Sequence, residues 1–264
     1  MLRSADDLKG LAITATDGAI GEIDQFYFDD EDWAVRYLVV TTGTWLENKQ
    51  VLISPFSIEK VDLPGNQLFV NLTMKQVLNS PDIDTHKPVS RQHETDYLNY
   101  YGYPPYWGGP YLWGSEMHPA GVLAMPSMIQ EAAVQEAAAA RAPEDPRDIH
   151  LRSTAEVTGY HIQASDGEIG HVEDFVIEED SWAIRYVVVD TLNWWPGGNV
   201  LVSPQWVTTV DWAERKVFVN LTREAIKSGP EYDKSRLISR DYESALYGHY
   251  QKSGYWGQGQ SARR

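Results

Sequence analysis

The chain has 264 residues, with 22 Lys or Arg against 38 Asp or Glu, so its formal net charge at pH 7 is −16. This charge repels phosphate backbones, and we expect no direct binding to nucleic acid. The lack of cysteine excludes disulfides, thiolate metal sites and cysteine nucleophiles. There is no apolar run of about 18 residues, so we expect no membrane insertion. Because a repeat begins within a few residues of Met1, we also expect no secretory leader and a cytoplasmic location.

The sequence contains an internal duplication. The segment 17–42, DGAIGEIDQFYFDDEDWAVRYLVVTT, returns at 166–191 with a displacement of 149 residues. About 39 of roughly 107 paired positions are identical, without a gap. We therefore predict three parts. They are a first repeat at 1–101, an aromatic and Pro/Gly-rich tail with an Ala-rich linker helix at 102–149, and a second repeat at 150–264.

Short strands separated by turns fill the first part of each repeat. In the first repeat they are expected at 9–14, 20–28, 33–42, 50–53, 57–61 and 67–71. The second of these strands contains Gly21, which lacks a side chain and would permit a bulge or close packing. The third strand is apolar on both faces, which suits a strand covered from both sides. This spacing predicts a mainly β fold of two small, bent antiparallel β-barrels, each followed by short helices.

Helices are expected after the strands. Thr73 can cap a helix that continues to Leu78, and a second helix is predicted from Ser90 to Tyr101, with its match at 239–250. The segment 101–114 is rich in proline, glycine and aromatic residues and is therefore neither an ordinary helix nor a central strand. The alanine-rich segment 127–141 predicts a spacer helix.

Two arginines, Arg36 and Arg185, stand at equivalent places in otherwise apolar strands. An unpaired buried guanidinium is costly, so we predict an ion pair within each repeat. The expected carboxylate partners are Asp62 and Asp211, or Asp24 and Glu173. The alternative is that these arginines bind an anion.

No catalytic residue, cofactor site or metal site is predicted. The acidic turns 29–32 and 178–180 are interpreted as solvated turns, with weak calcium or magnesium binding as the alternative. The seven histidines form no HxH or HxxxH pair. The two DGxxG motifs are interpreted as structural turns. Their residues are Asp17, Gly18 and Gly21 in the first repeat and Asp166, Gly167 and Gly170 in the second.

The aromatic tails are the candidate interaction surface. Large amphipathic side chains are favoured at protein interfaces because they bury much area at low entropic cost. The alternative is that they fold back onto their own barrel or onto the sister barrel. The candidates are Tyr101, Tyr103, Tyr106, Trp107, Tyr111, Trp113, Tyr250, Tyr255 and Trp256.

Several motifs carry a family resemblance. The DGxxG turns, the WAxRYxVV strands, the VLxSP segments and the VNLT junctions resemble the PRC-barrel. This domain forms the cytoplasmic part of the photosynthetic reaction-centre H subunit and the C-terminal half of the ribosome maturation factor. The SRxxE helix, with Ser90, Arg91 and Glu94, and the YYGYPPYWG tail resemble the stand-alone bacterial branch, here as a tandem of two copies.

The resemblance implies adaptor work rather than catalysis, with no family-wide catalytic residues to carry over. We expect a non-enzymatic adaptor or scaffold made of two pseudo-twofold barrels that binds an unidentified protein, including at a membrane-associated or photosynthetic-type complex. Self-association through the post-barrel helices is a further expectation. One alternative is a protein that binds a small ligand or metal ion between the barrels. Another is an RNA- or ribosome-associated factor.

Overall fold

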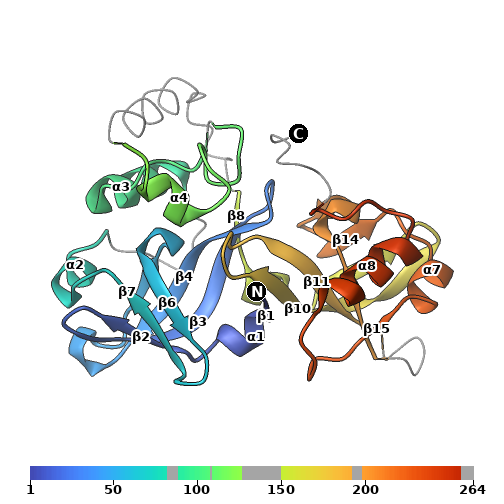
Figure 1. Ribbon diagram of the computed structural model, residues 1–264, viewed down its shortest axis with the longest axis horizontal. Coiled ribbons are helices and arrows are strands. Elements are labelled where there is room, and N and C mark those ends of the chain that lie inside the picture. Colours follow the sequence, from blue (N-terminus) through green and yellow to red (C-terminus); the bar gives the residue numbers. More distant parts are fainter. Residues whose placement is uncertain (82–88, 108, 127–149, 192–197, 257–264) are drawn as a thin grey trace. The chain divides into compact units, whose positions relative to one another are not determined.

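The computed structural model describes residues 1–81, 89–107, 109–126, 150–191 and 198–256 (Figure 1). The chain is mainly β and forms two compact units, each with its own sheet. The first unit consists of Asp7–Ser153 together with Asp180–Ala183. The second unit consists of Met1–Asp6, Thr154–Glu179 and the described residues within 184–256. The spacer helix expected at 127–141 lies outside the described residues.

The sheet of the first unit has the hydrogen-bonded order β5-β4-β3-β2-β7-β6. Its end strands β5 and β6 follow one another through the 3-10 turn η2, so the chain returns from one end of this order to the other. A further 3-10 turn, η1, precedes β5. The bounds are β2 Ala12–Ala15, β3 Gly18–Asp29, β4 Ala34–Thr42, η1 Thr44–Leu46, β5 Gln50–Ile53, η2 Pro55–Ser57, β6 Ile58–Asp62 and β7 Gln67–Val70.

The second unit repeats this plan in the order β13-β14-β9-β10-β11-β12-β15. Its last strand, β15, corresponds by the 149-residue displacement to positions 82–83, which lie outside the described residues. The bounds are β9 His161–Ala164, β10 Gly167–Glu178, β11 Ile184–Asp190, β12 Asn199–Val202, η3 Pro204–Trp206, β13 Val207–Asp211, β14 Lys216–Val219 and β15 Glu231–Tyr232.

One pairing in each unit departs from the expected antiparallel sheets. Strand β2 pairs with β7 in parallel, and β9 pairs with β14 in parallel, whereas the other neighbours in the two orders are antiparallel. The hairpin of β6 and β7, like that of β13 and β14, brings its second strand back beside the start of the repeat in the same direction. The two sheets are therefore mixed rather than purely antiparallel.

The first strand of each repeat lies in the unit that the other repeat builds. Strand β1, Leu2–Ser4, pairs antiparallel with β10, and strand β8, Leu151–Ser153, pairs antiparallel with β3 (Figure 1). Short helices, α1 at Ala5–Leu8 and α6 at Thr154–Val157, follow these two strands. The compact units are therefore not contiguous in sequence, unlike the repeats.

Short helices follow each set of strands, as expected. Thr73 caps α2, Met74–Leu78, with a full capping box, and Ser90 caps α3, Arg91–Tyr101. The remaining helices are α4 Pro119–Leu123, α7 Arg223–Lys227 and α8 Arg240–His249. Within the described residues, no helix has the length and apolar character needed to cross a membrane.

The DGxxG turns join the sheet to the helix that follows it. The Asp17 carboxylate accepts a hydrogen bond of 2.7 Å from the backbone of Met74 at the start of α2, and Asp166 does the same for Arg223 at the start of α7. Strand β3 has a register shift beside Gly21, where a Cβ atom would overlap the carbonyl oxygen of Thr41. Gly21 therefore serves both the bulge and the close approach of β4.

Candidate functional site

Helix α3 carries a glutamate into the interior of the first unit. Glu94 is 0% exposed and shares the inner face of the helix with Tyr97 and Leu98, three and four residues further on. The hydroxyl of Tyr97 donates to the carbonyl oxygen of Leu52 at 3.0 Å and so holds the helix against β5. The carboxylate of Glu94 is thereby placed among other polar groups of the same unit.

We call Asp29, Arg36, Glu94, Tyr106 and His150 the buried charge cluster. The Tyr106 hydroxyl donates to Oε1 of Glu94 at 2.5 Å, and Nε2 of His150 lies 2.7 Å from Oε2 of Glu94. The guanidinium of Arg91, one turn earlier in α3, lies 3.3 Å from the same oxygen. These contacts join α3, the aromatic tail and the residue that precedes β8.

The guanidinium of Arg36 forms the second half of the cluster. It lies 2.9 Å from Asp32 and 3.5 Å from Asp29, and it donates to the carbonyl oxygen of Leu112 at 2.6 Å. Its carbon atom Cζ lies 3.9 Å from the centre of the Tyr106 ring, a cation–π contact. The arginine therefore ties the β3–β4 turn to the aromatic tail.

The expected arginine ion pairs are present, but their expected partners were wrong. In the first unit Asp62 contacts Lys60, and Asp24 accepts a hydrogen bond from Gln50. The β3–β4 turn, closed by Trp33 at φ 52°, instead folds its own carboxylates back onto Arg36.

The second unit shows the same correction. Arg185 pairs with Glu178 at 2.6 Å, whereas Glu173 pairs with Lys234 and Asp211 accepts from the backbone of Glu214.

Three carboxylates of the acidic turn 29–32 pair with arginines, and only Glu31 is exposed, which corrects the interpretation of this segment as a solvated turn. Asp29 is buried and shares Arg36 with Asp32, while Asp30 pairs with Arg152 at 2.9 Å. Pairing with arginine is what lets carboxylates lie inside the unit at all. Among the described residues, no group of three or more His, Asp or Glu side chains is arranged to hold a metal ion.

Burial and pairing set the protonation states of the cluster. Burial raises the pKa of Asp29, but the Arg36 charge and backbone hydrogen bonds outweigh it, so the pKa lies below its usual value. Burial lowers the pKa of His150, but the hydrogen bond and charge of Glu94 outweigh it, so the pKa lies above its usual value. Burial and the Glu94 charge raise the pKa of Tyr106 well above its usual value, so this phenol stays a neutral donor.

The second unit has a related but simpler arrangement. Glu243, equivalent to Glu94, accepts hydrogen bonds from Tyr186 at 2.7 Å and Tyr255 at 2.9 Å, and pairs with Arg240 at 3.0 Å. By the 149-residue displacement, Met1 stands where the first unit has His150. The histidine therefore distinguishes the first unit from the second.

The aromatic tails fold back onto the units that precede them. Tyr106, Trp113 and Tyr250 are buried, which removes them from the interaction surface predicted for these tails. Trp113 donates through Nε1 to the carbonyl oxygen of Ser181 at 2.7 Å, and its ring packs edge-on against Phe56. A buried indole that finds both an apolar contact and an acceptor acts as a core residue.

The other tail aromatics keep part of their surface exposed. Tyr103 contacts the hydroxyl of Ser57 at 2.8 Å and stacks on Tyr101. Trp107 lies beneath Arg91, and Trp256 lies equivalently beneath Arg240, each with the guanidinium carbon 4.3 Å from the ring centre. The half-buried members are Tyr101, Tyr103, Trp107, Tyr111 and Tyr255, and Trp256 is exposed.

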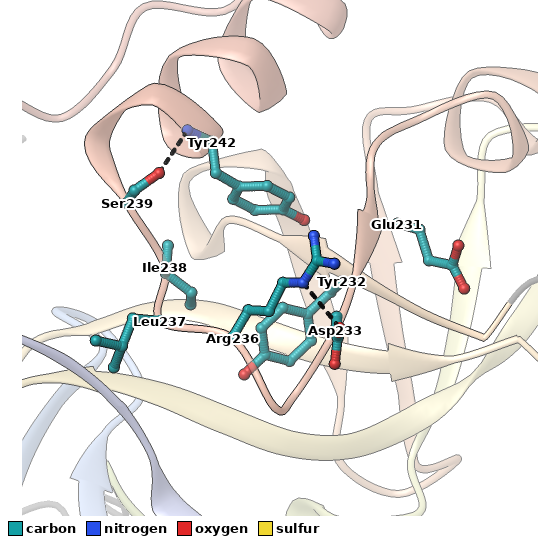
Figure 2. Close-up of a pocket in the computed structure, with 8 residues that line it drawn as sticks. All are labelled: Glu231, Tyr232, Asp233, Arg236, Leu237, Ile238, Ser239 and Tyr242. Carbon is teal, nitrogen blue, oxygen red and sulfur yellow. Dashed lines mark hydrogen bonds and ion pairs between the residues drawn. The ribbon is translucent and has the colours of Figure 1, made fainter.

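The second unit contains a small open pocket (Figure 2). Its volume is about 200 Å³, below the roughly 300 Å³ at which small-molecule sites begin. The Arg236 guanidinium, which lines it, is already paired with Asp233 at 3.2 Å, and Leu237 is 75% exposed. The lining is Glu231, Tyr232, Asp233, Arg236, Leu237, Ile238, Ser239 and Tyr242. This pocket brings together no pair of acid and base aimed at one point.

Sequence reasoning missed both Glu94 and His150 as interior residues. For Glu94 a signal was available, because Ser, Arg and Glu recur at 90, 91 and 94 and at 239, 240 and 243, with Arg and Glu one helical turn apart. For His150 no such signal existed, since its equivalent is Met1. Its burial follows from the exchanged position of β8, which the repeat pattern does not reveal.

These features define a class of protein. The chain contains small β-rich domains in which a buried glutamate fixes a following helix and an aromatic tail to the sheet. The family model of the PRC-barrel domain matches residues 2–76, so the first repeat contains a PRC-barrel domain. The assignment of the second copy to this family rests on the internal repeat. No curated protein matches the chain.

Proposed function

We propose that this protein is a non-enzymatic adaptor that uses an outer face of its first PRC-type unit to bind a protein partner. A membrane-associated complex is the setting that the family likeness suggests. The observation that carries the proposal is the burial of the groups best suited to chemistry. Glu94 and Arg36 are 0% and 1% exposed, and each is already engaged with partners in its own unit.

A substrate would have to displace these internal partners to reach the cluster. Breaking a buried ion pair by removing one partner costs about 3–5 kcal/mol, which makes the cluster a poor binding site. Its contacts instead hold α3 and the aromatic tail in fixed positions on the sheet. A rigid helix with a fixed outer face suits recognition of another protein, because little entropy is lost on binding.

The outer face of α2 and α3 is the surface that we assign to the partner. We call Leu78 and Tyr100 the α2–α3 face. They are 51% and 41% exposed, and the Tyr100 hydroxyl ties the two helices together by donating to the carbonyl oxygen of Gln76 at 2.8 Å. The equivalent residues of the second unit are Lys227 and His249, which are polar. The apolar character of this face thus belongs to the first repeat and supports a partner that binds there.

A photo-crosslinking experiment in the native cell tests this role. A benzophenone amino acid replaces Leu78 in the full chain, and the matched control replaces Lys227, the equivalent residue of the second unit. We expect one defined protein to be crosslinked from position 78 but not from position 227, and its capture to be lost when Tyr100→Glu is added. Equal crosslinking from both positions, or capture unaffected by Tyr100→Glu, would contradict the proposal.

A further inference from the structure

The two strands that are exchanged between the repeats are chemically identical. Both β1 and β8 have the sequence Leu-Arg-Ser. Each pairs antiparallel with the long second strand of the other repeat, β10 for β1 and β3 for β8. Neither first strand lies in the unit built by its own repeat.

The edges that receive these strands make matching contacts. Arg3 pairs with Glu179 at 2.7 Å, and Arg152 pairs with Asp30 at 2.9 Å. All four residues are related by the same 149-residue displacement. An arginine on the incoming strand therefore meets a carboxylate just beyond the end of the receiving strand in both units.

The serine and backbone contacts also correspond. The Ser4 hydroxyl donates to Asp174, and the Ser153 hydroxyl donates to Gln25, at equivalent positions of β10 and β3. The residue before each incoming strand accepts a backbone hydrogen bond from the receiving turn. The backbone N–H of Glu179 donates to the carbonyl oxygen of Met1 at 2.8 Å, and the backbone N–H of Asp30 donates to the carbonyl oxygen of His150 at 2.9 Å.

These contacts are those of recognition by strand addition. Backbone hydrogen bonds supply affinity, and the Arg–carboxylate and Ser contacts supply selectivity for the incoming strand. Both incoming strands match, and so do both receiving edges. An edge therefore cannot distinguish a Leu-Arg-Ser strand of its own chain from the same strand of a different molecule. Exchange of identical elements between molecules is a low-cost route to association.

We propose that the β3 and β10 edges are strand-acceptor sites for the Leu-Arg-Ser strand of a second copy of this chain, so that two copies join by reciprocal exchange. Within one chain the tether holds the strand at an effective concentration in the millimolar range. Exchange between chains therefore requires local opening and increases with protein concentration. This inference is independent of the adaptor role.

A charge-reversal experiment on the full chain tests the proposal. Arg3→Glu reverses the charge on the incoming strand, and Glu179→Arg reverses the charge at the edge that receives it; both side chains are about one-fifth exposed. Each variant alone places like charges together. In a mixed dimer, the reversed strand of one variant meets the reversed edge of the other, and the two native partners also meet.

We expect the 1:1 mixture, after co-refolding at high concentration, to form a heterodimer at least about fivefold above the level of either variant alone, given two restored pairs. Size-exclusion chromatography with light scattering and native mass spectrometry measure it. The chain with both changes is the matched control and should remain as monomeric as the unaltered protein. Folded monomers that give no heterodimer on mixing would overturn the proposal.

A second measurement covers the case in which a charge-reversal variant fails to fold. The chain has no cysteine, so a single introduced cysteine is the only thiol in each variant. Leu2→Cys and Glu178→Cys are made in separate chains, at residues that lie opposite each other in β1 and β10. After co-refolding and oxidation, the mixture should give an intermolecular disulfide about tenfold above a control pair of Leu2→Cys with Glu59→Cys, an exposed residue of β6. A yield equal to this control would refute exchange between chains.

Discussion

The imidazole Nε2 of His150 lies 2.7 Å from the carboxylate Oε2 of Glu94, inside the first unit. The histidine immediately precedes β8, which the second repeat contributes, and the glutamate lies on α3 of the first repeat. This one contact thus holds the exchanged strand β8 and helix α3 together. Because both side chains are nearly inaccessible to water, the strength of the contact depends on the charge that each carries.

The stability of the first unit should fall as the pH rises above the usual histidine pKa. The folded pKa of His150 lies above its usual value near 6.5, so its stabilisation is fully present below the unfolded pKa and is lost as pH rises through the folded pKa. The charged and titratable groups interacting with it are Glu94, Arg91, Asp29, Asp30, Glu31 and Tyr106.

Thermal unfolding between about pH 5 and about pH 9 measures this dependence. His150→Met places in the first unit the residue that the second unit has at this position. This variant should not show the loss of stability at higher pH. A variant that keeps the slope of the unaltered protein would show that another group causes it.

Glu94→Gln should destabilise the first unit by about 3 kcal/mol, because it removes the carboxylate charge that pairs with the buried His150 and the part-buried Arg91. Urea denaturation followed by tyrosine and tryptophan fluorescence measures the change. Glu224→Gln, at an exposed position of α7, is the control and should alter stability by less than about 0.5 kcal/mol. Similar effects of the two substitutions would contradict a structural role for the buried charge cluster.

Arg36→Lys should cost more than the equivalent Arg185→Lys. A lysine cannot reproduce the planar contacts of Arg36 with Asp32, the Leu112 carbonyl and the Tyr106 ring, so we expect a loss of about 3 kcal/mol. Arg185 is more exposed, and its replacement should cost about 1 kcal/mol. Chemical denaturation of both variants provides the comparison, and an equal loss would argue against the difference in burial as the cause.

Gly21→Ala should destabilise the first unit by about 2 kcal/mol or more, because the added methyl group would overlap the carbonyl oxygen of Thr41 and push β4 away. Gly248→Ala in α8 is the matched control. A Cβ atom there meets nothing within 4 Å, and the helix should gain up to about 1 kcal/mol. The melting temperatures of the two variants should therefore move in opposite directions.

Local patterns predicted local structure well. The capping residues Thr73, Ser90 and Ser239 mark helix starts because their side chains must satisfy nearby backbone donors, a requirement visible in sequence. Gly21 was predicted to be a site of a bulge or of close packing because it lacks a side chain. The PRC-type fold of the first repeat follows from such local motifs taken together.

The partners of particular side chains were not predictable in the same way. The acid that pairs with Arg36 depends on how the β3–β4 turn curls, and candidates at Asp24 and Asp62 were equally compatible with the sequence. The aromatic tail presented a similar difficulty, because a tyrosine such as Tyr106 is equally suited to a protein interface and to a core. Strand exchange could not be predicted, because a duplicated sequence is the same whether each first strand pairs within its own repeat or with the other repeat.

The crossing of the first strands also sets an order of events during protein synthesis. The ribosome synthesises the first repeat before the second. The β3 edge can receive strand β8 only after residues 151–153 have been made. Until then a nascent first repeat presents an unfilled edge, which is open to pairing with neighbouring chains on the same messenger. The maturation of the first domain is therefore timed by the translation of the second.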